Sequence, residues 1–327
     1  MPSVPQVICV TGGSGFLGSY CVKLLLERGY RVQTTVRDPT NEKKVGHLKA
    51  LPGANERLTI FKANLLEEGS FDEAIKDCSV VLHTASPVEL KNQNRDQLVA
   101  PAVQGTLNVL RSAARTPGIR RVVLTSSMAA VYIHCDTKPV EHVFTEDDWS
   151  HEELIEMNKM WYCVSKTLAE RAAWNFMENL SDAHFDLVAM CPTRIHGPMF
   201  KIELNESSEK IYDNLVGNVN DIPRVTRSVV DVRDVAFAHI AAFENPQASG
   251  RYTLVAASPT EEEIARAVKA ARPNAPVASK LAHGTGFVAK HCSSAKAEKE
   301  LGIRFIPLED MVRETCDSLT RIGLVSS

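Results

Sequence analysis

Residues 7–30, VICVTGGSGFLGSYCVKLLLERGY, join a short apolar strand to an amphipathic helix through a glycine-rich turn. Gly12, Gly15 and Gly18 follow one another in this turn at intervals of three residues. Such glycines allow a tight turn, a close approach of the backbone to a pyrophosphate, and close packing of the helix on the strand. The amides at the start of the helix favour a phosphate. We therefore expect a dinucleotide site here, the alternative being a glycine-rich turn that holds no ligand.

The first half of the chain alternates short β-branched runs with longer amphipathic stretches, which is the pattern of repeated βαβ units. Between the fourth and fifth runs, Val99, Val103, Leu107, Leu110 and Ala114 recur at helical spacing and predict a helix that packs on the sheet. The fold class predicted is α/β, a Rossmann-type doubly wound parallel sheet. The strands expected in it are 6–11, 31–36, 58–62, 80–83, 121–125, 185–191 and 251–255.

After Cys191 the alternation gives way to polar and proline-containing segments. Val229 and Val230 then lead back towards the sheet and into a helix over 232–243, and Thr260 with Glu263 predicts a capping box for a helix over 261–271. We therefore expect a smaller C-terminal α/β substrate domain that is interleaved with the first. The predicted division is 1–191 plus about 225–256 for the NADP-binding Rossmann domain, and 192–224 plus 257–327 for the substrate-binding portion.

Composition narrows the class of partner. The 327 residues hold 37 basic and 40 acidic side chains, for a net charge of −3, and the basic ones are dispersed, so neither nucleic acid nor a membrane surface is expected. No segment approaches the roughly 20 apolar residues of a membrane span. Eight cysteines lack CxxC pairing, the histidines lack ligand spacing and no N-terminal targeting pattern is visible. We expect a cytoplasmic protein without a metal site that acts on a small molecule.

The end of the second strand decides which dinucleotide binds, and its two charged residues make opposite predictions. Asp38 could hold the ribose 2′-hydroxyl of NAD, whereas Arg37 could accommodate the 2′-phosphate of NADP. Lys43 and Lys44 follow within a helical turn. A charge-assisted contact contributes about 1.5 to 3 kcal/mol, so the basic residues favour NADP. The alternative is that Arg37 and the lysines only form a solvated face, in which case Asp38 would favour NAD.

Tyr162 and Lys166 are four residues apart at the start of a helical stretch, so both project from one face. Carbonyl reduction needs a proton for the oxygen, and a fixed ammonium lowers the pKa of a phenol towards the range where it can serve. Ser126 and Ser127 end the fifth predicted strand, at the edge where ligands of parallel sheets bind. We predict Ser127, Tyr162 and Lys166 as the catalytic residues, with Ser126 as the alternative serine and strand-end capping as the structural interpretation.

Seven segments together carry a family resemblance that covers nearly the whole chain. They are VTGGSGFLGS, LLLERGYRVQTTVRDPTNEKKVGHL, EEGSFDEAIKDC, LHTASPV, RRVVLTSSMAAVY, KMWYCVSKTLAERAAW and AFENPQASGRY. On these segments the chain resembles the extended short-chain dehydrogenase/reductase family, within it the group of dihydroflavonol, cinnamoyl-CoA and phenylacetaldehyde reductases. The resemblance implies catalysis by the serine, tyrosine and lysine named above.

The same resemblance implies a set of residues around NADP(H). Arg37 and Lys44 would take the 2′-phosphate, Asn64 and Leu65 would lie at the adenine, and the backbone of 192–193 would lie near the nicotinamide. The predicted cofactor site comprises Thr11, Gly12, Ser14, Gly15, Phe16, Leu17, Gly18, Arg37, Lys44, Asn64, Leu65, Thr84, Ala85, Ser86, Tyr162, Lys166, Pro192 and Thr193. The family usually has aspartate at the position of Asn64.

Three departures concern the substrate. Tyr132 stands where dihydroflavonol reductases carry an asparagine, and Arg194 and His196 interrupt a segment that is usually apolar. The pocket is expected at Tyr132, 194–200 and 201–219, with Tyr132, Arg194 and His196 as substrate residues. A satisfied structural histidine in a Gly-Pro turn is the alternative interpretation of His196.

The function predicted is NADPH-dependent reduction of an aldehyde or ketone to an alcohol, with Tyr162 as proton donor. One alternative is a nucleotide-sugar epimerase or dehydratase that recycles NAD, which Arg37 argues against. The other is a non-catalytic NADP-sensing protein, in which the dinucleotide changes affinity for a partner. Either a monomer or a homodimer is compatible with the sequence.

Overall fold

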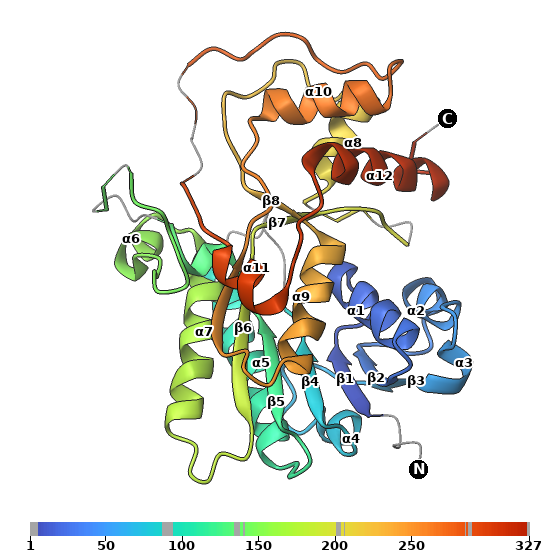
Figure 1. The fold of residues 1–327 in the computed structure, drawn as a ribbon, viewed down its shortest axis with the longest axis vertical. Helices are drawn as coiled ribbons and strands as arrows, with labels where there is room; N and C mark the ends of the chain where they lie inside the picture. The colour runs from blue at the N-terminus through green and yellow to red at the C-terminus, as the bar shows by residue number, and fades with distance from the viewer. Residues whose placement is uncertain are drawn as a thin grey trace.

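A seven-stranded parallel sheet forms the centre of the molecule (Figure 1). The computed structural model describes residues 6–86, 94–133, 138–139, 141–200, 204–205, 207–284, 286 and 290–325. The strand order is β3-β2-β1-β4-β5-β6-β9, so the chain winds outwards in both directions from β1 and β4. The predicted fold is confirmed. The strands are β1 (Val7–Thr11), β2 (Arg31–Val36), β3 (Leu58–Lys62), β4 (Val80–His83), β5 (Arg121–Thr125), β6 (Asp186–Pro192) and β9 (Gly250–Leu254).

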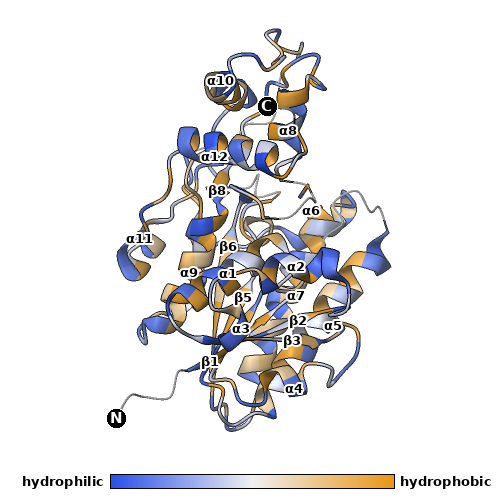
Figure 2. Cartoon of the chain, turned by 90° about the vertical axis from the view of Figure 1, so that its right-hand side faces the viewer, coloured by the Kyte–Doolittle hydropathy of each residue, from blue (hydrophilic) through white to orange (hydrophobic). Residues whose placement is uncertain are grey.

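Helices cover both faces of this sheet because its strands are apolar on both faces. In β1, Ile8 and Val10 face one helical layer and Cys9 faces the other. The first layer holds α1 (Phe16–Glu27), α2 (Glu42–Lys49), α9 (Val232–Glu244) and α11 (Ala295–Leu301), and the second holds α4 (Asp72–Ile75), α5 (Arg95–Ala114) and α7 (Trp161–Glu178). Several helices carry a hydrophobic and a hydrophilic side in Figure 2.

Helix α5 is the helix predicted between the fourth and fifth strands. Val99 and Leu110 of the predicted face are buried, whereas Val103, Leu107 and Ala114 are only half-buried. The buried face is wider than predicted because α5 packs on the sheet and also along α7. It includes Leu98, Ala102, Val109 and Ala113.

The C-terminal portion lies beyond the carboxyl ends of the strands (Figure 1). It contains α8 (Glu209–Val216), α10 (Glu261–Ala271) and α12 (Leu308–Arg321), which share a separate apolar cluster. The predicted capping box at the start of α10 is present: the Glu263 amide donates to Thr260 Oγ1 at 3.1 Å, and the Thr260 amide donates to Glu263 Oε2 at 2.7 Å. The short elements are α3 (Ala54–Arg57), α6 (Glu152–Met157) and the 3-10 turn η1 (Met128–Ala130).

One expectation about the return of the chain is wrong. Val229 and Val230 do not rejoin the main sheet; they belong to β8 (Val229–Asp231), which pairs in parallel with β7 (Arg194–His196) in a separate two-stranded sheet. The reason is that β6 is already paired on both sides, by β5 and β9. The chain returns to the main sheet only with β9. The β7–β8 pair therefore joins the main sheet to the C-terminal portion.

Candidate active site

The glycine-rich turn adopts the geometry that its spacing predicts. Gly12 has a φ of +70°, and a Cβ at this position would lie 2.9 Å from the Ala85 Cα atom. A Cβ at Gly18 would lie 2.4 Å from the Gly12 carbonyl oxygen, so a larger residue could not be accommodated without a shift of the backbone. Gly15 is the N-cap of α1 and has no side chain to cap its amides. The turn thus fits a phosphate.

Hydrogen bonds join Thr11, at the start of this turn, to residues 83–85. Thr11 is fully buried; its Oγ1 accepts from the Ala85 amide at 3.1 Å and is hydrogen-bonded to His83 Nδ1 at 2.8 Å. Thr84 Oγ1 donates to the Thr11 carbonyl at 2.6 Å. Burial, with a smaller effect of Lys166, lowers the pKa of His83 to about 3, so this imidazole is neutral. The Thr11 side chain is thus used to hold the ends of β1 and β4 together.

The charged residues after β2 behave differently from each other. Asp38 Oδ1 accepts from the Thr40 hydroxyl at 2.6 Å and from the Thr40 amide at 2.9 Å, and these bonds lower the pKa of Asp38. Arg37 is exposed and makes no hydrogen bond or ion pair with the described residues. Lys44 lies in the first turn of α2. The structure therefore uses Asp38 within its own turn, whereas the Arg37 guanidinium is exposed.

The predicted adenine position lies at the start of the loop that follows β3. The Asn64 side chain is bonded within this loop: its Oδ1 accepts from the Leu66 amide at 3.2 Å and its Nδ2 donates to Glu67 at 3.0 Å. Leu65 packs against Gly105 of α5, where an added Cβ would meet it at 3.0 Å. The Asn64 amide therefore shapes the loop, and Leu65 is the apolar surface at this place.

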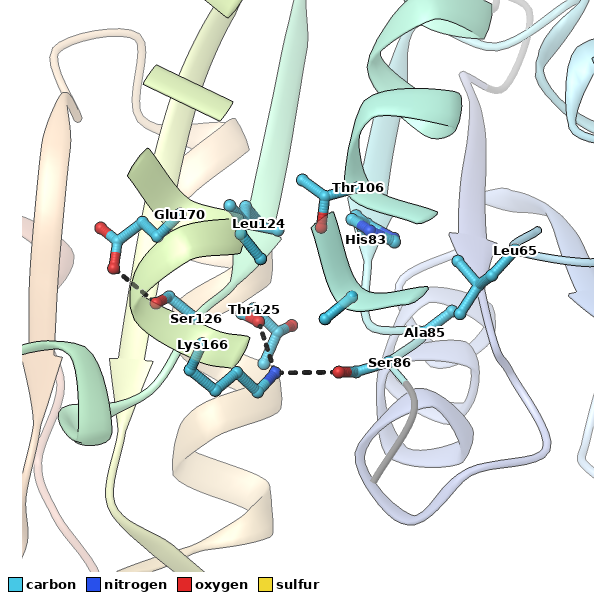
Figure 3. Close-up of a pocket in the computed structure, with 12 residues that line it drawn as sticks. Leu65, His83, Ala85, Ser86, Thr106, Leu124, Thr125, Ser126, Lys166 and Glu170 are labelled. Atoms are coloured by element: carbon cyan, nitrogen blue, oxygen red, sulfur yellow. Dashed lines mark hydrogen bonds between the residues drawn. The ribbon is translucent and has the colours of Figure 1, made fainter. Parts of the chain in front are cut away.

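Lys166 lies in a small cavity at the carboxyl edge of the sheet (Figure 3). Its ammonium donates to Ser86 Oγ at 3.2 Å and to the Thr125 carbonyl at 3.3 Å, so it bridges the ends of β4 and β5. Burial lowers the pKa of Lys166 to about 8, against an opposing effect of Glu170. The fold therefore holds a cation at a fixed point on this edge.

The two serines after β5 have different surroundings. Ser126 Oγ donates to Glu170 Oε2, as Figure 3 shows, and Glu170 is paired with Arg251 of β9 at 2.7 Å. Ser127 Oγ accepts from the Ala129 amide at 3.1 Å, which leaves the Ser127 hydroxyl hydrogen to be donated elsewhere. Ser126 is thus part of a buried network. Ser127 remains the serine with a donor to offer.

Sequence reasoning missed Glu170 and Arg251. A signal for Glu170 was present, because it continues the face of α7 that carries Tyr162 and Lys166 at intervals of four residues. Tyr162 is half-buried in the first turn of α7, and its carbonyl accepts from Ser165 Oγ at 2.7 Å. Nothing in the sequence pairs Arg251 with this helix, because the two are 81 residues apart.

Pro192 and Thr193 directly precede β7, and Tyr132 follows the 3-10 turn η1. Pro192 ends β6, and the Thr193 hydroxyl donates to the Ser228 carbonyl at 2.7 Å. Tyr132 packs in an apolar cluster with Met128 and Phe144, and burial raises its pKa to about 12. Of the predicted pocket region 201–219, residues 201–203 and 206 lie outside the described residues.

Arg194 and His196 both belong to β7. Arg194 is half-buried, and burial followed by the charge of Arg227 lowers its pKa. His196 is 4% exposed, and its Nδ1 finds no hydrogen-bond partner among the described residues. Nδ1 thus lacks, among the described residues, the partner that the interpretation of His196 as a satisfied structural histidine requires. The Gly-Pro turn that follows offers it no acceptor or donor.

A second cavity, of about 320 Å³, lies in the C-terminal portion. It is lined by α8, by residues 218–223 and by Glu261. Within the described ranges there is no group of three or more His, Cys, Asp or Glu side chains that could hold a metal ion, and no helix that is long and apolar enough to cross a membrane. The seven described cysteines are unpaired, and Cys135 lies outside these ranges.

Comparison with known proteins gives consistent relatives. The model of the NAD dependent epimerase/dehydratase family matches residues 8–256. A cinnamoyl-CoA reductase of Medicago truncatula is 42% identical over 96% of this chain and 95% of its own length. Tetraketide alpha-pyrone reductase 1 of Arabidopsis thaliana is 40% identical over 98% of this chain and 97% of its own.

Solved structures agree with these relatives. Gre2 from Candida albicans in complex with NADPH superimposes with a TM-score of 0.85 at 29% identity, covering 98% of this chain and 100% of its own. Vestitone reductase from alfalfa gives a TM-score of 0.82 at 32% identity, covering 98% and 99%. The predicted fold and the predicted resemblance to reductases are confirmed.

Proposed function

Because this chain belongs to the NAD dependent epimerase/dehydratase family, we propose that it is a reductase that uses NADPH to convert an aldehyde or ketone to an alcohol, with Tyr162 as proton donor. The observation that carries the proposal is the position of Lys166. Its ammonium is bonded to Ser86 and Thr125 at the carboxyl edge of the sheet, on the helical face that also carries Tyr162. The reductase names of the relatives support the same reaction class.

NADPH supplies the hydride when it is bound. The turn at Gly12 and the uncapped start of α1 hold the pyrophosphate, and Arg37 with Lys44 holds the 2′-phosphate. Leu65 would contact the adenine, with Asn64 shaping its loop. The backbone of 192–193 would lie beside the nicotinamide. Asp38 supports this choice of cofactor, because its carboxylate is already bonded to Thr40.

Side chains of the protein supply the proton that the carbonyl oxygen needs. As the carbonyl oxygen gains negative charge, the Tyr162 hydroxyl donates its proton to that oxygen. Lys166, four residues further along the same face of α7, stabilises the negative charge left on the phenol oxygen and also holds ribose hydroxyls. Ser127 donates a hydrogen bond to the same oxygen, for which its hydrogen is available because its Oγ already accepts from Ala129.

The proposal extends to organisation and location. The Rossmann domain comprises 1–191 with about 225–256, and the substrate-binding portion comprises 192–224 and 257–327, except that α11 of the latter packs on the main sheet. Tyr132, Arg194 and His196 line the substrate site. The unpaired state of the described cysteines supports a cytoplasmic location, and the chain acts as a monomer or homodimer on a small-molecule carbonyl.

The test is a Tyr162→Phe variant assayed for oxidation of NADPH against a panel of aromatic and aliphatic aldehydes. We expect kcat to fall by about 10² to 10⁴, the usual contribution of a positioned acid, while NADPH binding persists. Tyr30→Phe is the matched control, because Tyr30 precedes β2 at the opposite edge of the sheet and its hydroxyl donates to Glu244 Oε1 at 2.9 Å.

Equal loss in both variants would indicate a general structural effect and contradict the role of Tyr162. Absence of turnover by the unaltered chain, with NAD bound tightly after purification, would favour a recycling epimerase. Absence of turnover with NADPH binding intact would favour a sensor.

A further inference from the structure

Arg194 stands at the junction between the two parts of the chain. It follows Pro192, the last residue of β6, by two positions, and its strand β7 pairs with β8 in the register Arg194 opposite Val229. The side chain of Ile195 packs against the main apolar core. Because side chains alternate along a strand, Arg194 and His196 share the other face of β7, away from this core.

Arg194 differs from neighbouring arginines in having no counter-ion. Arg227 is paired with Glu261 at 3.0 Å, Arg233 with Asp231 at 2.8 Å and Arg251 with Glu170 at 2.7 Å. Arg194 makes no hydrogen bond or ion pair with the described residues, although it is half-buried. A guanidinium keeps its charge under these conditions. A partly desolvated charge without a partner costs free energy that a ligand carrying the opposite charge would recover.

His196 carries a buried and unsatisfied nitrogen on this face. It is 96% buried, since its exposed fraction is 4%, and its Nδ1 has no partner among the described residues. Burial, with a smaller effect of Arg194, lowers the pKa of His196 to about 4. The imidazole is therefore neutral and can donate from one nitrogen and accept at the other. A buried nitrogen without a partner, beside a half-buried guanidinium without a counter-ion, indicates a ligand site, because folded proteins satisfy buried polar groups where they can.

The reacting groups lie within electrostatic reach of this cation. The pKa of Arg194 responds first to burial and to Arg227, and then to Glu261, Tyr132 and Tyr162. Glu261 is held by Arg227, and no carboxylate of the described residues comes within ion-pair distance of Arg194. Tyr162 is the proposed proton donor. Arg194 also follows the carboxyl end of β6, at the same edge of the sheet where Lys166 is held, so an anion bound by Arg194 would lie at the edge where the carbonyl is reduced.

We infer that Arg194 binds a carboxylate of the substrate, and that the preferred substrates are oxo acids whose carboxylate is a few bonds from the reducible carbonyl. The guanidinium offers two parallel donors that match a carboxylate, and His196 provides a further polar contact on the same face. The inference rests on the proposed function for its reaction, but it concerns recognition alone.

The experiment compares twin substrates in which a carboxylate is replaced by its neutral amide. The twins are phenylglyoxylate with phenylglyoxylamide, and meta-formylbenzoate with meta-formylbenzamide, each reduced with NADPH by the full chain. We expect kcat/KM to be at least tenfold higher for the carboxylate twin, mainly through a lower KM, as a charge-assisted bond implies. Equal kcat/KM values, or higher values for the amides, would overturn the inference already with the unaltered chain.

An Arg194→Met variant then tests the residue itself. We expect the ratio of kcat/KM for carboxylate over amide to fall at least tenfold, and an Arg194→Lys variant to keep part of it. Arg266→Met is the control, because Arg266 is 70% exposed on α10 and has only a surface pair with Glu262. A parallel loss for both twins would show that Arg194 is structural and overturn the inference.

Binding separates this inference from the proposed function. The alcohol products of both twins are titrated calorimetrically into the NADP-loaded chain and into the Arg194→Met variant. Tighter binding of the carboxylate product that depends on Arg194 would support the recognition site even if no turnover occurs. Turnover of neutral aldehydes without any preference for the carboxylate would leave the reductase standing and overturn the anion site.

Discussion

Two groups of charged and polar residues lie at the carboxyl edge of the sheet, and they differ in how they are satisfied. In the first group, between β5, α7 and β9, Glu170 is bonded to Ser126 and paired with Arg251, and both members of the ion pair are buried. In the second group, on β7, Arg194 lacks a counter-ion and His196 lacks a partner at Nδ1 among the described residues. The same fold therefore completes one set and leaves the other incomplete.

This difference separates scaffold from site. A buried ion pair that is fully bonded fixes the geometry of β5, α7 and β9, and it has nothing left to offer a ligand. An unsatisfied group costs stability until something binds it. Lys166 is intermediate, because it bonds to Ser86 and Thr125 yet its burial still disfavours the charge. Four variants test this comparison.

The largest effect on stability is expected in the Glu170–Arg251 group. Glu170→Ala leaves Arg251 buried and unpaired, so the free energy of unfolding should fall by about 3 to 5 kcal/mol. Denaturant unfolding measures it. Glu178→Ala, at the exposed end of α7, is the control and should change stability by less than about 0.5 kcal/mol. Similar values for both variants would break the comparison.

The stability difference between the unaltered chain and a Lys166→Met variant should depend on pH. The pKa of Lys166 is 10.5 in a model compound and about 8 in the fold, so between these pH values the unfolded chain holds more of this proton. Stability should therefore rise with pH from 8 to 10.5 in the unaltered chain relative to Lys166→Met, by roughly 3 kcal/mol at most. Parallel stability curves for the two chains would contradict the burial of a charged lysine.

Arg37 should matter for cofactor and little for stability. Arg37→Ser removes one charge-assisted contact of about 1.5 to 3 kcal/mol, so kcat/KM for NADPH should fall about tenfold to a hundredfold, and much less for NADH. Arg31→Ser, an exposed arginine at the other end of β2, is the control for steady-state kinetics. Equal losses with both cofactors would return the ribose contact to Asp38.

The smallest effect is expected at His196. Because its Nδ1 is already unsatisfied, His196→Leu removes a cost as well as a contact, and the free energy of unfolding should change by less than about 1 kcal/mol or rise. Thermal unfolding of the chain without substrate measures it. A loss as large as that of Glu170→Ala would show that His196 is part of the scaffold.

Local pattern was sufficient for most of the fold. β2, β3, β4 and β5 have the predicted bounds, β1 begins one residue later than predicted, and β6 and β9 are displaced by one residue at both ends. Helix α10 begins at its predicted capping box. These features depend on neighbours in the chain: apolar runs, glycine spacing and a cap. The pairing of β7 with β8 was missed, because each strand has three residues and the partner lies over thirty residues away.

The same division applies to the site. By itself the sequence determined the phosphate turn, the tyrosine and lysine on one helical face, and the residue types Arg37, Arg194 and His196, because these follow from spacing and side-chain chemistry. Only the tertiary structure decided which of these groups are satisfied: Asp38 by Thr40, Ser126 by Glu170, and Arg194 by no described residue. The physical reason is that solvation and pairing depend on long-range packing, which residue spacing does not encode.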